Sequence, residues 1–503
     1  PSAGGVSRNT YTQFDVGQEG AVLNNARNNT QTQIGGWVQG NPWLAKGEAK
    51  VILNEVNSSN PSQLKGYLEV AGKSAQVVIA NPSGLICDGC GVINADRFTL
   101  TTGQAVMNQG YLESFRVRDG QITIEGKGLD GSLTPYTDIY SRALTINASL
   151  YAKNLTVALG QNDITVKDQV TPQINTATSN LNPNPVSTSF ALDVGQLGGM
   201  YAGKIFLVGN ENGLGVRNAG SINSTESTLT LNANGDLINT GNMIANKDQL
   251  QINVQHIQNT GNISSATSQV SVNSQTLDNS GLISSADELH LQQQGNLTNT
   301  GTLNAARIAI DSDSLNNQGS IEQTGTQALD LNAGELSNQG GQIGLISNTS
   351  GSGTGGNTGS SGTTQPVSTN NSAQDGGSVA VVDNTSTVPK IYAAGYIHVK
   401  QRLNNDHGGI ATNGSVNLIS QNGVNNENGQ LQLGTVTVQG GTFNNQQGQF
   451  TAQQADIQTQ SLNNQSGQMN IAQKLNINSQ DVDNTQGKIQ AVDQIDLAVR
   501  SEE

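Results

Sequence analysis

Cys87 and Cys90, in the sequence Cys87-Asp88-Gly89-Cys90, are the side chains of this chain best suited to covalent chemistry. One Cys-x-x-Cys pair supplies half of a common zinc site, but no second Cys or His pair lies at a suitable spacing. A thioredoxin-like redox motif needs a helix N-terminus, whereas these cysteines lie between extended, glycine-punctuated segments. The pattern favours a short local disulfide formed in an oxidising compartment. Reduced structural thiols, and redox or metal chemistry, remain as alternatives.

No other group of side chains has the spacing of a catalytic or cofactor site. Gly213-Leu214-Gly215 lacks the third glycine of a dinucleotide-binding loop, and Asp311-Ser312-Asp313 lacks the spacing of a calcium loop. The four histidines are scattered, at His256, His290, His398 and His407. The sequence therefore predicts no catalytic residue, no cofactor, no metal and no small-molecule substrate, so the chain is not expected to be an enzyme.

The most regular polar feature is an asparagine that recurs every 18 to 21 residues within two blocks. Each copy stands in a row of alternate positions, as in Leu297, Asn299, Gly301, Leu303 and Ala305. Alternate side chains share one face of an extended chain, so this asparagine is predicted to lie on the buried face. The series comprises Asn218, Asn239, Asn259, Asn279, Asn299, Asn317, Asn338, Asn405, Asn426, Asn445, Asn464 and Asn484.

A buried amide without a partner costs about 1–3 kcal/mol, so a recurrent inward asparagine needs a reason. If the copies stack in register, each amide donates to one neighbour and accepts from the other, which forms a ladder. A simpler role as a turn former remains the alternative, but it does not explain the fixed inward register.

A period near twenty residues indicates an array of stacked coils. A second apolar pair precedes the asparagine motif in each period, as at Leu289 and Leu291, so each coil supplies several short strands. The sequence therefore predicts an all-β parallel β-helix, a solenoid whose successive coils lie about 4.8 Å apart.

The array is interrupted once. The predicted first block covers residues 216–346 and the second block covers 391–503, with a flexible Gly/Ser/Thr/Asn-rich excursion at 347–390 between them. Asn and Gly are two residues apart in the first block and three apart in the second, which predicts a wider corner or bulge throughout the second block. The last coil is expected to be truncated, as in a fragment of a longer repeat protein.

Residues 1–215 do not follow the repeat and are predicted to cap it. Fourteen of the eighteen aromatic residues precede residue 207, so this region has bulkier core material. The net charge of −15 disfavours sequence-independent binding to nucleic acid or to anionic lipid. No apolar run is long enough to span a bilayer as a helix. No signal peptide is visible at Pro1, so the chain is either cytosolic or has lost its targeting segment.

The first 220 residues resemble the two-partner secretion domain, which begins large exported exoproteins related to filamentous haemagglutinin. The similarity includes Ile52-Leu53-Asn54-Glu55-Val56 and Ile79-Ala80-Asn81-Pro82-Ser83-Gly84. It also covers residues 7–16, 20–25, 60–66, 100–103, 197–203 and 213–218, in the order of the family. The repeats that follow are similar to haemagglutinin repeats.

This resemblance implies a right-handed β-helix with an N-terminal capping secretion domain. It also implies a partner, a TpsB-type (CdiB-type) outer-membrane transporter whose periplasmic POTRA modules recognise the domain. Asn-Pro motifs are linked to secretion in this family, a role that carries over to Asn60-Pro61 and to Asn81-Pro82 with Ser83 and Gly84. Many members have Asn where this chain has Ser83, so position 83 could be tuned to one transporter.

The Cys-x-x-Cys after the second Asn-Pro resembles the contact-dependent growth inhibition (CdiA-type) and haemolysin branches of the family. The expected function is therefore secretion targeting, β-helix nucleation and a rigid shaft for a CdiA-type effector. A haemolysin or an adhesin of the haemagglutinin type is the alternative. Either way the expected location is the cell surface of a Gram-negative bacterium, reached through the periplasm after removal of a signal peptide. Any toxic activity, or binding to a target-cell receptor, would belong to other parts of the parent protein.

Overall fold

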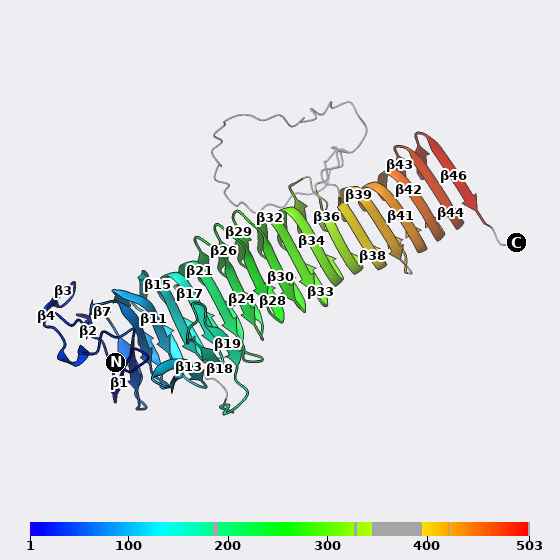
Figure 1. Cartoon of the computed structure of the whole chain (residues 1–503). Helices are drawn as coiled ribbons and strands as arrows, with labels where there is room; N and C mark the ends of the chain where they lie inside the picture. Colours follow the sequence, from blue (N-terminus) through cyan, green and yellow to red (C-terminus); the bar gives the residue numbers. More distant parts are fainter. Residues whose placement is uncertain (185–189, 326–328, 345–394, 421, 501–503) are drawn as a thin grey trace, which may run out of the picture.

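The computed structural model describes residues 1–184, 190–325, 329–344, 395–420 and 422–500, and they form a long parallel β-solenoid (Figure 1). Each coil has three faces, and on each face the strands of successive coils pair in parallel. The predicted all-β solenoid is therefore confirmed. The proposed excursion at 347–390 lies outside the described residues.

The strands of the solenoid itself fall into four sets by the faces that they occupy. The first face contains β1 (Val6–Tyr11), β5 (Val51–Val56), β8 (Ala75–Ala80), β11 (Ala95–Thr101), β24 (Leu229–Ala233), β27 (Leu250–Asn253), β30 (Val270–Ser274) and β46 (Gln494–Val499). The second face contains β6 (Ser62–Leu64), β9 (Leu85–Cys87), β14 (Gln121–Ile124), β16 (Ala143–Ile146), β20 (Phe190–Val194), β22 (Gly215–Asn218), β25 (Leu237–Asn239), β28 (His256–Asn259), β31 (Thr276–Asn279), β33 (Asn296–Asn299) and β40 (Val424–Asn425). The third face contains β2 (Ala21–Asn25), β7 (Tyr67–Gly72), β10 (Cys90–Ile93), β23 (Ser221–Ser224), β26 (Asn242–Ala245), β29 (Asn262–Ser265), β35 (Ser320–Gln323), β37 (Gln342–Ile343), β43 (Gln468–Ile471) and β45 (Lys488–Ala491). Longer strands bend at a corner and serve two or three faces, namely β15 (Leu129–Ser141), β17 (Ser149–Leu159), β21 (Gly199–Gly209), β32 (Leu282–Gln293), β34 (Thr302–Asn317), β36 (Leu329–Ser337), β38 (Gly395–Asn404), β39 (Gly409–Ser420), β41 (Gln430–Asn444), β42 (Gln449–Asn463) and β44 (Lys474–Asp483).

Alternation of apolar and polar residues builds the interior of the solenoid. In β34, Leu303, Ala305, Ile308 and Ile310 are all buried, while the residues between them are partly accessible. Such inward side chains from every coil join into one hydrophobic core that extends from Phe14 to Ile477. Each coil thus buries its apolar face only by stacking on its neighbours.

A second, four-stranded antiparallel sheet covers part of the first face. It consists of β12 (Gln104–Asn108), β13 (Tyr111–Val117), β18 (Asn162–Thr165) and β19 (Gln173–Thr176), in that order. The chain leaves the solenoid twice to form this sheet, each time at the corner between the first and second faces. Strands β12 and β13 follow β11, and strands β18 and β19 follow β17. Outward side chains of the solenoid, including Leu53, Val78 and Tyr140, form a separate small core with Phe115 of β13.

The N-terminal end of the solenoid carries a small cap. A hairpin of β3 (Thr30–Thr32) and β4 (Gly36–Val38) is followed by the 3₁₀ helix η1 (Pro42–Leu44). These elements lie at the end of the molecule opposite the C-terminus (Figure 1).

The described coils on either side of residues 345–394 are direct neighbours. Strand β36 pairs with β38 and β37 pairs with β39, in the same parallel manner as elsewhere in the shaft. The two repeat blocks therefore form one continuous stack.

Candidate functional site

The corner between the first and second faces holds both Asn-Pro motifs, in adjacent coils. Asn81 follows β8 and is fully buried, whereas Asn60 follows β5 and is exposed. The Asn81 Nδ2 donates to the carbonyl oxygen of Asn60 at 2.9 Å and to Ser62 Oγ at 3.0 Å. The structure thus brings the two predicted motifs together, and the Asn81 side chain of the second motif is hydrogen-bonded to the first.

The second motif forms a tight turn. The Gly84 amide donates to the Asn81 carbonyl at 3.0 Å, and the Ser83 amide donates to Asn81 Oδ1 at 2.9 Å. Pro82 occupies the second position of this turn, where its fixed φ is favourable, and Gly84 has a positive φ of 113°. Ser83 Oγ donates to the Ser58 carbonyl at 2.9 Å, so the serine that replaces a frequent asparagine also joins the two coils.

A cleft of about 430 Å³ opens beside this corner. Its lining includes Ser58 from the first corner, Pro82 from the second, and Gln104 from β12 of the second sheet. Arg8 and Glu55 also line the cleft and form an ion pair in which the carboxylate is largely buried. The cleft is thus bounded by the Asn-Pro corner on one side and by an edge strand on the other.

A buried ion pair joins two neighbouring strands of the first face, β11 and β15. Arg97 Nη1 lies 2.8 Å from Asp138 Oδ2, and Thr99 Oγ1 donates to the same oxygen at 3.1 Å. Burial raises the pKa of the Asp138 carboxyl, while the charge of Arg97 opposes that shift. Arg97 also donates to the carbonyl of Val170, in the segment that leads into β19. The ion pair is largely enclosed, and its arginine fixes the segment before β19 to the first face.

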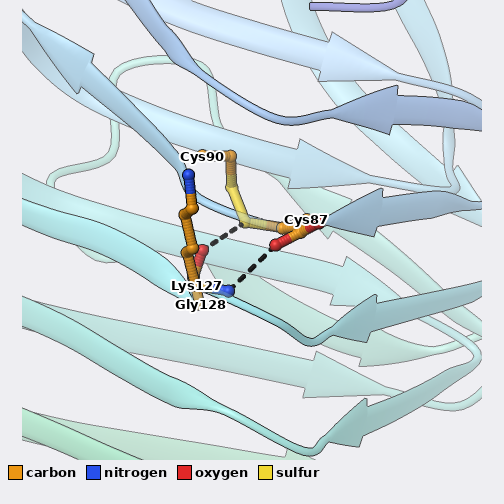
Figure 2. Close-up of a disulfide and its surroundings, with 5 residues drawn as sticks. Cys87, Cys90, Lys127 and Gly128 are labelled. Carbon is orange, nitrogen blue, oxygen red and sulfur yellow. Dashed lines mark hydrogen bonds between the residues drawn. A yellow bond between two sulfur atoms is a disulfide. The ribbon is translucent and has the colours of Figure 1, made fainter. Parts of the chain in front are cut away.

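Cys87 and Cys90 form a disulfide across the corner between the second and third faces, with a Cα–Cα distance of 5.3 Å (Figure 2). Both residues are buried. Cys87 Sγ lies 3.1 Å from the carbonyl oxygen of Gly128 in the next coil, a close contact rather than a hydrogen bond because the sulfur carries no hydrogen. The bond spans only the two residues Asp88 and Gly89, so it closes a very short loop.

A tyrosine–carboxylate pair lies next to this corner. Tyr67 of β7 extends across Gly91, and its hydroxyl donates to Asp130 Oδ2 at 2.7 Å. Burial and the hydrogen bond to Asp130 raise the pKa of Tyr67 to about 12. Burial alone would raise the pKa of Asp130, but hydrogen bonds from Ser132 and Tyr67 outweigh it, so the net shift is downward. The pair links two coils that are not adjacent. Its hydroxyl and carboxylate oxygens are engaged in hydrogen bonds and are not free to act as nucleophiles.

The twelve recurrent asparagines occupy this same corner between the second and third faces and form one continuous ladder. In each step the Nδ2 of one asparagine donates to the Oδ1 of the next, at 2.6–2.8 Å. All are buried except Asn484, which lies in the exposed last coil. Asn338 donates directly to Asn405, so the ladder crosses the interruption in the sequence.

The corners of the two repeat blocks differ as the Asn–Gly spacing predicts. In the second block the extra residue has a left-handed conformation, as in Gln447 at φ 55° and Ser466 at φ 54°. The wide corner begins one coil earlier than predicted, at Asn338. Here Gly340 has φ 71° and the Gly341 amide donates to the Asn338 carbonyl. The sequence does not reveal this change, because Gly340 and Gly341 lie two and three residues after Asn338 and so satisfy both spacings.

The histidines do not meet. His256 contacts Thr276, His398 of β38 stacks on Tyr396, and His407 in the corner after β38 bonds to Asp406, so none of these contacts joins one histidine to another. Within the described ranges, no group of three or more His, Cys, Asp or Glu side chains could hold a metal ion. In that same part of the chain, no helix has the length and apolar character to cross a membrane.

The sequence has three further Asn-Pro dipeptides, at residues 41–42, 182–183 and 184–185, and the first of them, Asn41-Pro42, lies in the cap. Asn41 Oδ1 accepts a hydrogen bond from the Trp43 amide at 3.0 Å and so caps η1. Asn41 Nδ2 donates to the Asn24 carbonyl, which fixes the cap to β2. Recurrence of the dipeptide itself was the signal that could have identified it.

Comparison with known proteins places these features in a family. The family model described as "TPS secretion domain" matches residues 1–239. A protein named "Toxin CdiA" from Yersinia pestis is 52% identical over 253 residues, which are 50% of this chain and 8% of that protein. The "tRNA nuclease CdiA-2" of Burkholderia pseudomallei is 46% identical over 246 residues, 48% of this chain and 8% of that protein.

A further relative, the "16S rRNA endonuclease CdiA" of Enterobacter cloacae, is 45% identical over 241 residues, 47% of this chain and 7% of that protein. Among solved structures, the filamentous hemagglutinin secretion domain is 30% identical, with a TM-score of 0.47. That comparison covers 57% of this chain and 89% of the solved one. The chain thus spans less than a tenth of the curated relatives that it matches.

Proposed function

The chain belongs to the two-partner secretion family, with the secretion domain in residues 1–239, and we propose that this domain directs export while the later coils form a rigid shaft. Proteins of this family leave Gram-negative bacteria through a partner outer-membrane transporter. The observation that carries the proposal is the Asn-Pro corner, where two motifs from adjacent coils meet beside an open cleft.

We assign transporter recognition to this corner. Asn60 is exposed and Pro82 lines the cleft, so both can contact a partner without any change in fold. Asn81 is buried and holds the corner together, so its part in recognition is indirect. The periplasmic POTRA modules of the transporter are the proposed partner.

The parent protein is proposed to be a CdiA-type effector of contact-dependent growth inhibition. Relatives named as nucleases of different RNAs both contain a segment similar to about half of this chain, so that segment is not what distinguishes their activities. We therefore assign no catalysis to this chain and place toxic activity, and contact with a target-cell receptor, elsewhere in the parent. These names favour the CdiA type over a haemolysin or an adhesin.

The test is a secretion assay on the parent protein with its transporter. Asn60→Ala and Pro82→Ala should lower the amount exported, while both purified variants keep the far-ultraviolet circular dichroism spectrum and Asn60→Ala also keeps the melting temperature. Asn296→Ala, at an exposed shaft position, is the matched control and should be exported normally. Normal export of both corner variants would contradict the proposed recognition site.

The same variants distinguish recognition from folding. The purified chain and the separately purified periplasmic modules should bind, and Asn60→Ala should weaken that binding. Asn81→Ala should instead lower the melting temperature, because it leaves the Asn60 carbonyl and Ser62 Oγ without their donor. If Asn81→Ala alone affected export, the corner would act through stability and not through contact.

A further inference from the structure

Both tryptophans of the chain are exposed on the N-terminal cap. Trp37 of β4 is 74% accessible and Trp43 of η1 is 88% accessible. Ile34, in the turn of the same hairpin, is 38% accessible. Large aromatic side chains are normally buried or partnered, so a pair of exposed tryptophans on one small element indicates contact with something outside the chain.

The cap holds these side chains outward on a fixed backbone. The buried Glu69 carboxylate accepts hydrogen bonds from the Gln33 and Ile34 amides at 2.7–2.8 Å, which anchors the tip of the hairpin. In η1, Leu44 is buried while its neighbour Trp43 points into solvent. Apolar contact with the solenoid end is thus supplied by Leu44, and the tryptophans are not needed for it.

Charge around the tryptophans differs from that of the chain as a whole. Arg27, whose backbone lies against Gly40 after β4, and Lys46, three residues after Trp43, are both exposed. Within residues 20–50 the only acidic residue is Glu48, against Arg27, Lys46 and Lys50. Residues 20–50, with three basic residues and one acidic residue, therefore carry a formal charge of +2 in a chain of net charge −15, with the exposed Glu19 and the buried Glu69 next to them.

We propose that this cap binds the surface of an anionic lipid bilayer, with Trp37 and Trp43 at the headgroup level and Arg27 and Lys46 against lipid phosphates. Tryptophan favours this interface because its ring is apolar while its indole N–H can still hydrogen-bond to water or headgroups. Basic residues near an anionic surface add attraction that falls off within a Debye length. Because the rest of the chain is acidic, the same field repels the shaft, and the molecule docks by its N-terminal end, at the far end of the solenoid from β46 (Figure 1). The proposal corrects the expectation from net charge alone, and it does not depend on transporter recognition.

Intrinsic fluorescence tests the proposal directly, because both tryptophans lie in the cap. The full chain is mixed with vesicles of phosphatidylcholine alone, or with about 30% phosphatidylglycerol added. We expect a blue shift, and quenching by brominated lipid, only with the anionic vesicles, with an affinity at least about tenfold higher than for neutral ones. An unchanged emission spectrum with anionic vesicles, with iodide still quenching fully, would overturn the proposal.

Two sets of variants assign the binding. Arg27→Glu with Lys46→Glu keeps both fluorophores and should abolish the blue shift. Trp37→Ser with Trp43→Ser should abolish co-sedimentation with anionic vesicles, whereas Leu197→Ser, at a site that is also 88% accessible, should not. If the tryptophan variants bind vesicles normally but lose binding to the transporter modules, the patch recognises protein, and the lipid proposal is wrong.

Discussion

The corner between the second and third faces is built differently in the two halves of the molecule. In the secretion domain, the register aligns apolar residues from successive coils at this corner, namely Leu64, Cys87, Ile124, Ile146 and Val194. From Asn218 onward every described coil has an asparagine there. The N-terminal column is held by apolar packing and one disulfide, and the shaft column by a hydrogen-bonded chain.

The junction between the apolar column and the asparagine column leaves one polar atom unpaired. Asn218 aligns with Val194, whose side chain has no hydrogen-bond donor. Asn218 Oδ1 is buried without a partner. All later ladder asparagines receive a donor from the coil before them. A ladder therefore has one unpaired acceptor at its first asparagine, whatever its length. The free-energy cost of that acceptor per coil falls as the number of coils increases.

The second repeat block differs from the first by an additional, outer ladder. Asn425, Asn444 and Asn463 each donate to the asparagine of the preceding coil, at 2.9–3.1 Å, in the direction opposite to the inner ladder. The first block has no such row, since its equivalent positions include Ile238, Asp278 and Thr298. The outer row accompanies the wide corner and its left-handed residue.

The largest predicted effect concerns the shaft, where the asparagine ladder replaces the apolar column. Leu303→Asp places an unpaired charge in the shaft interior and should reduce the free energy of unfolding by about 3–5 kcal/mol. Hydrogen exchange should accelerate mainly in the coils next to Leu303, because each shaft coil contacts only its neighbours. Asn296→Asp, at an exposed position seven residues before Leu303, is the control and should change neither quantity. An unaltered melting curve for Leu303→Asp would refute its inward orientation.

The next prediction compares the ladder's interior with its end. Asn299→Leu removes the ladder acceptor of Asn279 Nδ2, which keeps its bonds to the Gly281 and Thr302 carbonyls, and leaves Asn317 Oδ1 without a donor, so it should cost about 2–4 kcal/mol. Asn218→Leu removes an acceptor that is already unpaired and in effect moves the junction by one coil, so it should cost about half as much. Chemical denaturation of both variants measures the difference. Equal costs would mean that the ladder bonds do not determine stability at this corner.

The disulfide supplies a smaller effect in the apolar column. Cys87→Ala with Cys90→Ala should destabilise the secretion domain by about 2 kcal/mol, because the loop that the bond closes is short. Secreted protein should show no free thiol without reductant, since the cysteines are paired and buried. Ready labelling of either cysteine in folded, unreduced protein would contradict this assignment.

The smallest prediction distinguishes the two types of corner. Gln447→Gly should stabilise the second block by about 0.5–1 kcal/mol, because glycine adopts the left-handed conformation without the strain that a side chain adds. Thr300→Gly, in a narrow corner where no positive φ occurs, should destabilise by a similar amount. The melting temperatures of the two variants should therefore move in opposite directions. A shift in the same direction would show that the corners do not differ in backbone strain.

The sequence predicts the shaft well because its regular elements are local and repeated. Period-two alternation gives the inward residues, such as Leu303, and the spacing of Asn and Gly gives the corner type. Even so, the wide corner at Asn338 was missed, because Gly340 and Gly341 satisfy both spacings.

The secretion domain is less predictable because its main features depend on distant parts of the chain. The second sheet joins β13 to β18, which are separated by more than forty residues, and covers outward apolar residues such as Val78 that have no period of their own. Likewise, nothing local indicates that Asn81 is buried while Asn60 is exposed, since the two dipeptides are identical.

The direct stacking of Asn338 on Asn405 has a consequence for how such proteins change over time. The corner after Ile343 accepts a segment of fifty residues, 345–394, while the coils on either side keep the register found throughout the shaft. A corner of this kind separates the length of an inserted segment from the stability of the stack. It is where natural variation, or a deliberately grafted epitope or binding domain, can be added without redesigning the coils.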